Sequence, residues 1–275
     1  METSTHAAGF DAIAGLEVTE AVAAGFARDG IRTPTPVQRA AIPPLLEGRP
    51  VVVASGTGTG KTLAYLLPLL QRLRRDRSAR ALCVAPTTEL AIQILRVAER
   101  YRDPSVGAAP LISQANRRRQ AARLQRSTQL IVGTPERVVE AYLGRRLKGV
   151  GLVVLDEPEP ILSSPAAREL GEILSRPEPR VQQVLVGATF GERSERWIRE
   201  RLGPSVVRTR VEEDPLASQI AHYFVRLRHE GERELALLRL LDQERCRRVV
   251  VFSDQPPRIR HLYRTLTERG LAPVT

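Results

Sequence analysis

Hydrophobic residues along this chain fall into two alternating patterns. Short runs of adjacent apolar and β-branched residues are typical of strands buried on both faces of a sheet. These runs predict strands at residues 51–54, 81–85, 129–132, 152–155 and 183–186. Between them, apolar residues recur at helical spacing and predict helices at residues 37–46, 61–74, 89–101, 117–126, 137–144, 166–174 and 192–202. The alternation predicts a doubly wound α/β fold, with a parallel sheet and helices on both faces.

A break in this pattern divides the chain into two predicted domains. Gly203 and Pro204 end the last helix of the first part, and the acidic, proline-containing residues 212–215 are typical of a linker. Strand patterns then return at residues 222–227 and 248–252, and helix patterns at 232–241 and 258–269. We predict a first domain at residues 1–207, a linker at 208–215 and a second domain at 216–275. The second domain is expected to be partial, because about 60 residues form only a marginal core.

The composition adds a strong positive charge to this picture. The formal net charge is +11, and 40 of the 42 basic residues are arginine, since Lys61 and Lys148 are the only two lysines. Such a charge favours a polyanionic partner, because basic side chains displace the counterions condensed on phosphates. Codon usage is an alternative explanation of the arginine content, and it implies no partner.

Several function classes are disfavoured by what the sequence does not contain. No apolar stretch approaches the roughly 20 residues that span a bilayer, and the first residues show no signal-peptide pattern, so we expect no membrane association. Cys83 and Cys246 lie in or near apolar runs and are expected to be free thiols rather than a disulfide or a metal site. The default compartment is therefore the reducing cytoplasm.

A glycine-rich segment follows the first predicted strand and begins the next predicted helix. It consists of Ser55, Gly56, Thr57, Gly58, Thr59, Gly60, Lys61 and Thr62. Glycines let backbone N–H groups approach phosphates, and the helix N-terminus adds partial positive charge. We expect the segment to bind ATP, with Lys61 reaching the β- and γ-phosphates and the Thr62 hydroxyl holding Mg²⁺. The alternative, a glycine-rich turn without a ligand, does not explain the agreement of strand, helix, lysine and threonine.

Two adjacent carboxylates follow the predicted strand at residues 152–155. Functional groups gather at the carboxyl ends of strands in an open parallel sheet. We therefore expect Asp156 to hold Mg²⁺ through water and Glu157 to polarise the attacking water as a general base. An acidic helix N-cap is the alternative interpretation.

The phosphate loop and the acidic strand end, in this order, resemble the DEAD-box helicases, a family of ATP-dependent RNA helicases. The resemblance implies a RecA-like first lobe and part of a second RecA-like lobe. The residues from Pro34 to Gln38 resemble the family's Q motif, whose glutamine amide complements the N6/N7 edge of adenine. Gln38 is therefore expected to select ATP. Phe10 is expected to stack nearby, and a role as a simple core anchor is an equal alternative.

The resemblance also implies an RNA site and a coupling segment. Residues 86–93 and 134–137 resemble two family motifs that contact the RNA backbone, which gives Pro86, Thr87, Thr134, Pro135 and Arg137 as RNA-binding residues. The segment that couples ATP to strand separation corresponds to Gly187, Ala188 and Thr189, together with Glu159 of the acidic tetrad.

This chain departs from the family pattern at several positions. The tetrad reads Asp156-Glu157-Pro158-Glu159, and Gly187 lacks the hydroxyl that would link to it. Thr88 replaces a basic residue and Glu136 replaces a glycine. The basic residues 114–119 lie where we expect a Gly-Gly pair, and they are either a phosphate contact or a solvated helix face. The chain also ends before the family's arginine-finger motif, so the isolated chain is expected to bind ATP but to hydrolyse it slowly.

Two functions remain open from the sequence. The first is an ATP-dependent RNA helicase that couples the binding and hydrolysis of ATP to RNA binding or strand separation. The second is a nucleotide-gated RNA-binding scaffold with weakened catalysis. A phosphate-loop ATPase that acts on proteins or small molecules leaves Gln38, residues 86–93 and the charge unexplained.

Overall fold

The chain forms two compact units, Met1–Asp214 and Pro215–Thr275. The computed structural model describes residues 9–113, 128–144, 147–174, 181–211, 221, 223–243, 248–253, 255–271 and 273. The predicted helix at 117–126 and the basic residues 114–119 lie outside these ranges, as does Cys246. Each unit is described here by itself.

The first unit is built on a parallel sheet. Among the described residues the sheet has seven strands in the order β3-β4-β2-β5-β6-β1-β7, and every pair of neighbours is parallel. The strands are β1 (Val51–Ala54), β2 (Arg80–Val84), β3 (Gly107–Leu111), β4 (Thr128–Gly133), β5 (Val150–Asp156), β6 (Gln182–Gly187) and β7 (Val207–Arg210). The doubly wound α/β fold predicted from the sequence is confirmed.

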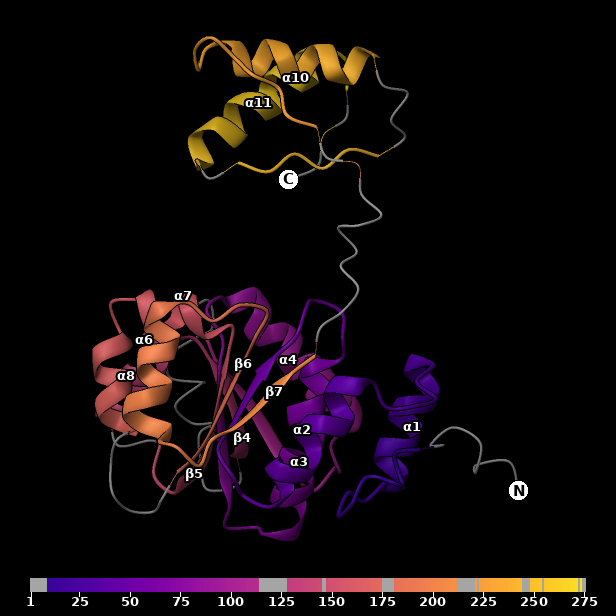
Figure 1. Cartoon of the computed structure of the whole chain (residues 1–275), viewed down its shortest axis with the longest axis vertical. Coiled ribbons are helices and arrows are strands. Elements are labelled where there is room, and N and C mark those ends of the chain that lie inside the picture. The colour runs from indigo at the N-terminus through magenta and orange to yellow at the C-terminus, as the bar shows by residue number, and fades with distance from the viewer. Residues whose placement is uncertain are drawn as a thin grey trace. The chain divides into compact units, whose positions relative to one another are not determined.

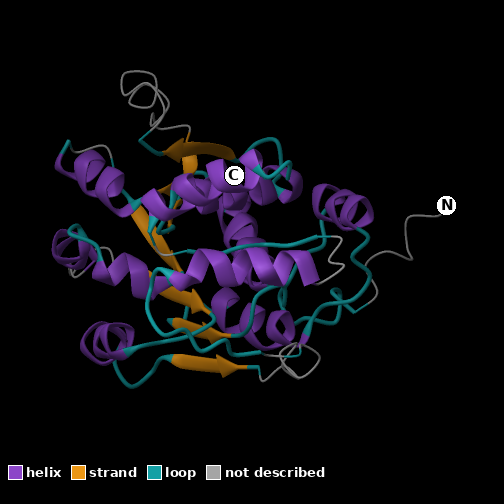
Figure 2. Ribbon diagram, turned by 90° about the horizontal axis from the view of Figure 1, so that it is seen from above, coloured by secondary structure: helices purple, strands orange, loops and turns teal. Residues whose placement is uncertain are grey.

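Helices cover both faces of this sheet (Figures 1 and 2). Figure 1 shows α1 to α4 on one face and α6 to α8 on the other. Their bounds are α1 (Glu20–Asp29), α2 (Pro36–Leu46), α3 (Lys61–Arg75), α4 (Thr88–Tyr101), α6 (Pro135–Leu143), α7 (Pro158–Ser163) and α8 (Ala167–Leu174). The chain then forms α9 (Glu192–Trp197), which continues as a π-helical turn over Ile198–Leu202.

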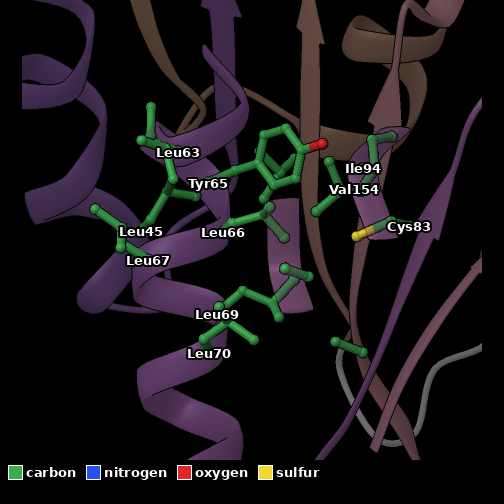
Figure 3. Packing of buried hydrophobic residues seen from close by; sticks show 14 of the residues in the cluster. Leu45, Leu63, Tyr65, Leu66, Leu67, Leu69, Leu70, Cys83, Ile94 and Val154 are labelled. Atoms are coloured by element: carbon green, nitrogen blue, oxygen red, sulfur yellow. The ribbon is translucent and has the colours of Figure 1, made fainter. Parts of the chain in front are cut away.

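The period-two alternation of the strands divides the core into two clusters. Val51 and Val53 of β1 pack in one cluster, and Val52 packs in the other. Because successive side chains of a strand point to opposite faces, a continuous apolar run is required when both faces are covered. Figure 3 shows the first cluster, where Tyr65 extends from α3 toward Cys83 and Val154 on the strands.

The two edge strands and the first helix were not predicted from the sequence. β3 consists of Gly-Ala-Ala-Pro-Leu and lacks β-branched residues, and β7 consists of Val-Arg-Thr-Arg, with a single apolar residue, and pairs only with β1 at the edge of the sheet. α1 begins at the N-cap Thr19 and ends at Gly30, whose φ of 67° suits a glycine. Since β7 runs to Arg210, the first residues of the predicted linker at 208–215 belong to the sheet.

The second unit contains two helices among its described residues, α10 (Glu232–Gln243) and α11 (Pro256–Glu268). Both were predicted from apolar spacing. The strands predicted at 222–227 and 248–252 are wrong for the described residues 223–227 and 248–252, which form no strand. A strand needs a hydrogen-bonded neighbour, and none pairs with these apolar segments in the described part of the unit.

Within the described ranges, no helix is both long enough and apolar enough to cross a membrane.

Candidate nucleotide and nucleic-acid site

The motif residues lie at the carboxyl ends of the strands. The phosphate loop follows β1, Asp156 ends β5 and Gly187 ends β6, and β5, β6 and β1 are neighbours in the sheet. Pro86 and Thr134 follow β2 and β4 on the other side of β5. Because all the strands are parallel, these ends lie along one edge of the sheet, where ligands bind in open α/β folds.

The phosphate loop connects β1 to the N-terminus of α3. Gly58 and Gly60 have φ angles of 82° and 92°, in the left-handed region that disfavours other residues. Gly60 is the N-cap of α3 and provides no side-chain cap, so the first N–H groups of this helix are left for another acceptor. A helix N-terminus of this kind suits an anionic phosphate.

Lys61 lies over its own loop. Its Nζ donates hydrogen bonds to the carbonyl oxygens of Ser55 and Gly56, both at 2.6 Å. A lysine ammonium has three donors, so one remains for a phosphate oxygen. The Ser55 Oγ is buried and has no hydrogen-bond partner within the described part of the chain. A buried hydroxyl without a partner is unfavourable, and a phosphate in the loop would provide an acceptor.

Gln38 links α2 to the phosphate loop. Its Nε2 donates to the carbonyl oxygen of Gly60 at 3.1 Å, and its Oε1 accepts from the backbone N–H of Thr35 at 2.9 Å. A Cβ at Gly60 would lie only 2.5 Å from this Nε2, so the close approach requires glycine. The amide keeps one free N–H and one acceptor lone pair, which is what an adenine edge needs.

Phe10 lies in the core and not at the loop. It is fully buried, and its ring stacks on Phe26 with centroids 4.2 Å apart. Phe26 in turn meets the edge of Tyr101. No surface of the Phe10 ring is exposed to a base, so this placement fits the alternative interpretation of Phe10 as a core anchor.

Asp156 is a buried carboxylate whose proton affinity is altered by its surroundings. Burial raises its pKa from 3.8 to about 6, and the nearby Glu157 charge acts in the same direction. Tyr65 opposes this rise, because its hydroxyl donates to Asp156 Oδ2 at 2.8 Å, and the Lys61 charge also lowers the pKa.

Tyr65 is a site residue that the sequence analysis missed. Its hydroxyl donates to Asp156 Oδ2 at 2.8 Å. Burial and the Asp156 charge raise the pKa of Tyr65 and the nearby Thr62 side chain acts against this rise, so Tyr65 lies beside both residues expected to hold Mg²⁺. The sequence feature that could have identified Tyr65 is its hydroxyl on the apolar face of a helix, three residues after Thr62.

The oxygen atoms at this point fit a magnesium ion. Mg²⁺ in nucleotide sites is typically held by one or two carboxylates together with substrate phosphates and water. Asp156 and the Thr62 hydroxyl meet this requirement. Groups of three or more His, Cys, Asp or Glu that could hold a metal on their own do not occur in the described ranges.

Glu157 has an unusual backbone conformation. Its φ is 55°, the only positive value for a non-glycine residue in the described ranges. Its N–H donates to the carbonyl oxygen of Val186 at 2.7 Å, and Pro158 begins α7 directly after it. The strained conformation turns the chain sharply at the strand end and leaves the Glu157 side chain partly exposed there.

The coupling residues are joined to both the phosphate loop and the acidic strand end. The carbonyl oxygen of Gly187 accepts from the N–H of Ser55 at 3.1 Å. Ala188 and Thr189 are exposed beyond it. Glu159 does not contact Gly187; its Oε2 accepts from Gly191 N at 3.0 Å and from Ser194 Oγ at 2.5 Å. These hydrogen bonds, that from the Ser194 hydroxyl first, lower the Glu159 pKa.

The residues expected to bind RNA divide into exposed and buried ones. Thr87 is exposed at the start of α4, where its hydroxyl accepts from the N–H of Leu90, and Pro86 beside it is half-buried. Thr134 and Pro135 are buried at the start of α6. Arg137 is also buried and forms an ion pair with Glu140. In this structure Thr87 is therefore the expected RNA residue most open to a strand.

Comparison with known proteins agrees with this geometry. The family model described as DEAD/DEAH box helicase matches residues 35–197. The chain is 34% identical over 251 residues to an ATP-dependent RNA helicase CshA of Listeria monocytogenes, covering 88% of this chain and 47% of that protein. It is 32% identical over 268 residues to a DEAD-box ATP-dependent RNA helicase CshA of Geobacillus kaustophilus, covering 94% and 56%.

The chain spans about half the length of these curated relatives. A crystal structure of a DEAD box protein from the hyperthermophile Methanococcus jannaschii superposes with a TM-score of 0.65 and 24% identity, covering 93% of this chain and 70% of that one. This likeness supports the fold. With the family model matching more than half of its residues, the chain belongs to the DEAD/DEAH box helicase family.

Proposed function

We propose that this chain is the ATP-binding part of an ATP-dependent RNA helicase. The observation that carries the proposal is the phosphate loop after β1. Its Lys61 donates to the loop carbonyls, its Ser55 hydroxyl is buried, and the Lys61 charge acts on the buried Asp156 at the end of β5. The curated relatives named above are RNA helicases, and the net charge of +11 suits an RNA partner.

Each site residue has a proposed role in nucleotide binding. Lys61 moves its ammonium from the loop carbonyls to the β- and γ-phosphates, and the N-terminus of α3 adds partial positive charge. Gln38 recognises adenine with the remaining donor and acceptor of its amide. Thr62 and Asp156 would hold Mg²⁺, which would neutralise charge at the phosphates.

Hydrolysis requires a water molecule in line with the γ-phosphate. We assign its orientation to Glu157, which lies beside Asp156 at the strand end and is not held in an ion pair in any contact described. The water oxygen forms a bond to phosphorus while the bond to the β-phosphate oxygen breaks. The products are ADP and inorganic phosphate.

RNA is assigned to the edge formed by the ends of β2 and β4. Pro86, Thr87, Thr134, Pro135 and Arg137 lie there, and the exposed Thr87 with the N-terminus of α4 is suited to a phosphate. Arg137 would have to exchange Glu140 for a phosphate oxygen. These contacts position an RNA backbone without reading its sequence.

One observation favours the second candidate function, a nucleotide-gated RNA-binding scaffold. Gly187 has no side chain, so residue 187 offers no hydroxyl to the acidic strand end. A scaffold of this kind would bind ATP and RNA together and turn ATP over slowly.

We propose the cytoplasm as the compartment, because the Cys83 thiol is free and buried.

The deciding experiment measures ATP turnover with and without single-stranded RNA. A Lys61→Ala variant removes the ammonium and is expected to reduce turnover and ATP affinity by several orders of magnitude or to background. Lys148→Ala is the matched control, because it removes the other lysine of the chain, which belongs to no motif.

The two candidate functions give different results in this assay. RNA-stimulated turnover that Lys61→Ala abolishes and Lys148→Ala preserves supports the helicase. ATP-dependent RNA binding with negligible turnover supports the scaffold. A chain that binds no ATP contradicts both.

A further inference from the structure

The Glu159 carboxylate is part of a contact outside the nucleotide site. It lies at the start of α7, three residues after Asp156, and its partners belong to the segment after β6. Its Oε2 accepts three hydrogen bonds, from Gly191 N at 3.0 Å, Ser194 N at 3.4 Å and Ser194 Oγ at 2.5 Å. Ser194 is fully buried and Glu159 is half-buried, so the contact is shielded from water on the serine side.

The contact is specific for the side chains that make it. A Cβ at Gly191 would lie 2.9 Å from Glu159 Cδ and Oε1, so glycine at 191 lets the carboxylate approach the backbone. α9 has no side-chain cap of its own at Gly191, and Glu159 provides the acceptor that its first N–H groups need. An aspartate side chain is one methylene shorter, so its carboxylate would lie farther from Gly191 and Ser194.

Residue 187 cannot provide the same connection. It is a glycine, and a Cβ there would lie 3.1 Å from Pro158 Cδ and 3.5 Å from Glu157 Oε2. The proline ring therefore lies tightly against the place where a side chain at 187 would begin. Side-chain contact between the acidic turn and the segment after β6 passes instead through Glu159 and Ser194.

Residues 187–191 are thus held at both ends. At one end, Gly187 O accepts from Ser55 N of the phosphate loop, and Val186 O accepts from Glu157 N. At the other end, the Glu159 carboxylate holds Gly191 and Ser194. A change in the phosphate loop on nucleotide binding is transmitted along this segment only while both ends are fixed.

We propose that Ser194 is a positioning residue of this site, which transmits nucleotide binding to residues 187–191 by holding the Glu159 carboxylate. The proposal rests on the proposed function, because it assigns to this contact the link between ATP and RNA. It does not make Ser194 a catalytic residue, since Ser194 is buried and its hydroxyl faces Glu159.

The test compares Ser194→Ala and Glu159→Gln in the full chain. Three quantities are measured: the KM for ATP, the RNA-stimulated kcat, and amide hydrogen exchange of residues 187–191 with and without a non-hydrolysable ATP analogue. Ser163→Ala is the matched control, because the Ser163 hydroxyl donates at 2.8 Å to the backbone carbonyl of the same Glu159 and not to its carboxylate.

We expect Ser194→Ala to lower the RNA-stimulated kcat on the order of tenfold, while the KM for ATP stays within about twofold. Nucleotide-dependent protection of residues 187–191 should be lost in Ser194→Ala, reduced in Glu159→Gln, whose amide oxygen still accepts but carries no charge, and kept in Ser163→Ala. The Glu159→Gln/Ser194→Ala double variant should be no worse than Ser194→Ala alone, because both substitutions act on the same contact.

Other outcomes overturn the proposal. A Ser194→Ala protein that unfolds more easily but keeps its RNA stimulation and its nucleotide-dependent protection shows a purely structural role. Additive losses in the double variant show that the two residues act separately. If the unmodified chain has no RNA-stimulated turnover, the proposed function fails, and hydrogen exchange still tests the role of Ser194. Nucleotide-dependent protection of residues 187–191 that needs Ser194 supports the positioning role. Protection that is absent, or that does not depend on Ser194, contradicts it.

Discussion

Single buried polar groups set the properties of this site. Asp156 is buried and accepts a hydrogen bond from Tyr65, and desolvation raises its pKa to about 6. An ionised carboxylate in such a place lowers the stability of the folded protein. A buried ionised aspartate is expected at a position where its charge binds a cation and does not stabilise the fold.

This pKa gives a prediction of stability against pH. The folded-state pKa of Asp156 is raised above the value of 3.8, so ionisation above pH 6 costs folding free energy that is absent below pH 4. Asp156→Asn should therefore stabilise the nucleotide-free protein at pH 8 by at most about 3 kcal/mol. The gain should shrink as the pH falls from 6 toward 4. Urea unfolding at several pH values measures it.

A control of opposite sign is available in Asp103. Hydrogen bonds from the side chain and backbone of Ser105 lower the pKa of this half-buried carboxylate. Asp103→Asn should therefore lose stability at pH 8 rather than gain it. Asp156→Asn that destabilises the protein equally at all pH values would contradict the pH prediction.

The segments at the ends of β5 and β6 lie close together, so the residue type at one position restricts the other. β6 ends at Gly187, and the turn after β5 contains Pro158, whose Cδ lies within 3.1 Å of where a Cβ at 187 would be. The proline at 158 and the glycine at 187 therefore suit each other. The physical reason is steric, because a side chain at 187 would begin in tight contact with the proline ring.

This pairing predicts non-additive stabilities. Gly187→Ala should destabilise the protein by about 1 kcal/mol, because the new methyl group forces the Pro158 ring to move. Pro158→Ala removes that ring, so the double variant should lose less stability than the sum of the two single variants. Urea unfolding of the four proteins gives the interaction energy.

Gly151→Ala is the matched control for this cycle. Gly151 also lies in a strand, β5, but a Cβ there meets only Arg72 Nη2, at 3.7 Å. We expect this variant to be neutral or slightly more stable. An interaction energy near zero between residues 158 and 187 would show that the neighbouring turn shifts freely.

The two units of the chain differ in how well they bury their apolar residues. Every member of the two core clusters lies in the first unit. In the second unit, Phe224 and Phe252 are 97% and 90% exposed. Both lie in the segments where strands were predicted, and the described residues of this small unit form no sheet that could cover them.

The first unit should therefore fold and bind nucleotide by itself. A fragment of residues 1–214 contains every contact described for the phosphate loop, Asp156 and Glu159. Its affinity for ATP should lie within about twofold of the whole chain, and its main thermal transition within a few degrees. Calorimetry and nucleotide titration measure both. A fragment that is unfolded or has lost ATP affinity would show that the second unit supports the first.

Local sequence alone determined most of the elements and the phosphate loop. The apolar runs of β1, β2, β4, β5 and β6 and the glycines at 58 and 60 act through their immediate neighbours, so their conformations are visible in the sequence. The edge strands β3 and β7 were not, because pairing on one side relaxes the demand for a continuous apolar run.

Only the tertiary structure decided which polar groups meet. Tyr65 and Asp156 are 91 residues apart, and Glu159 and Ser194 are 35 apart, so no local pattern connects them. For Phe10 the sequence left two interpretations, stacking near the base or anchoring the core, and its burial against Phe26 fits the second. Sequence periodicity fixes which face of an element is apolar, whereas packing of elements against one another fixes which residues on those faces touch.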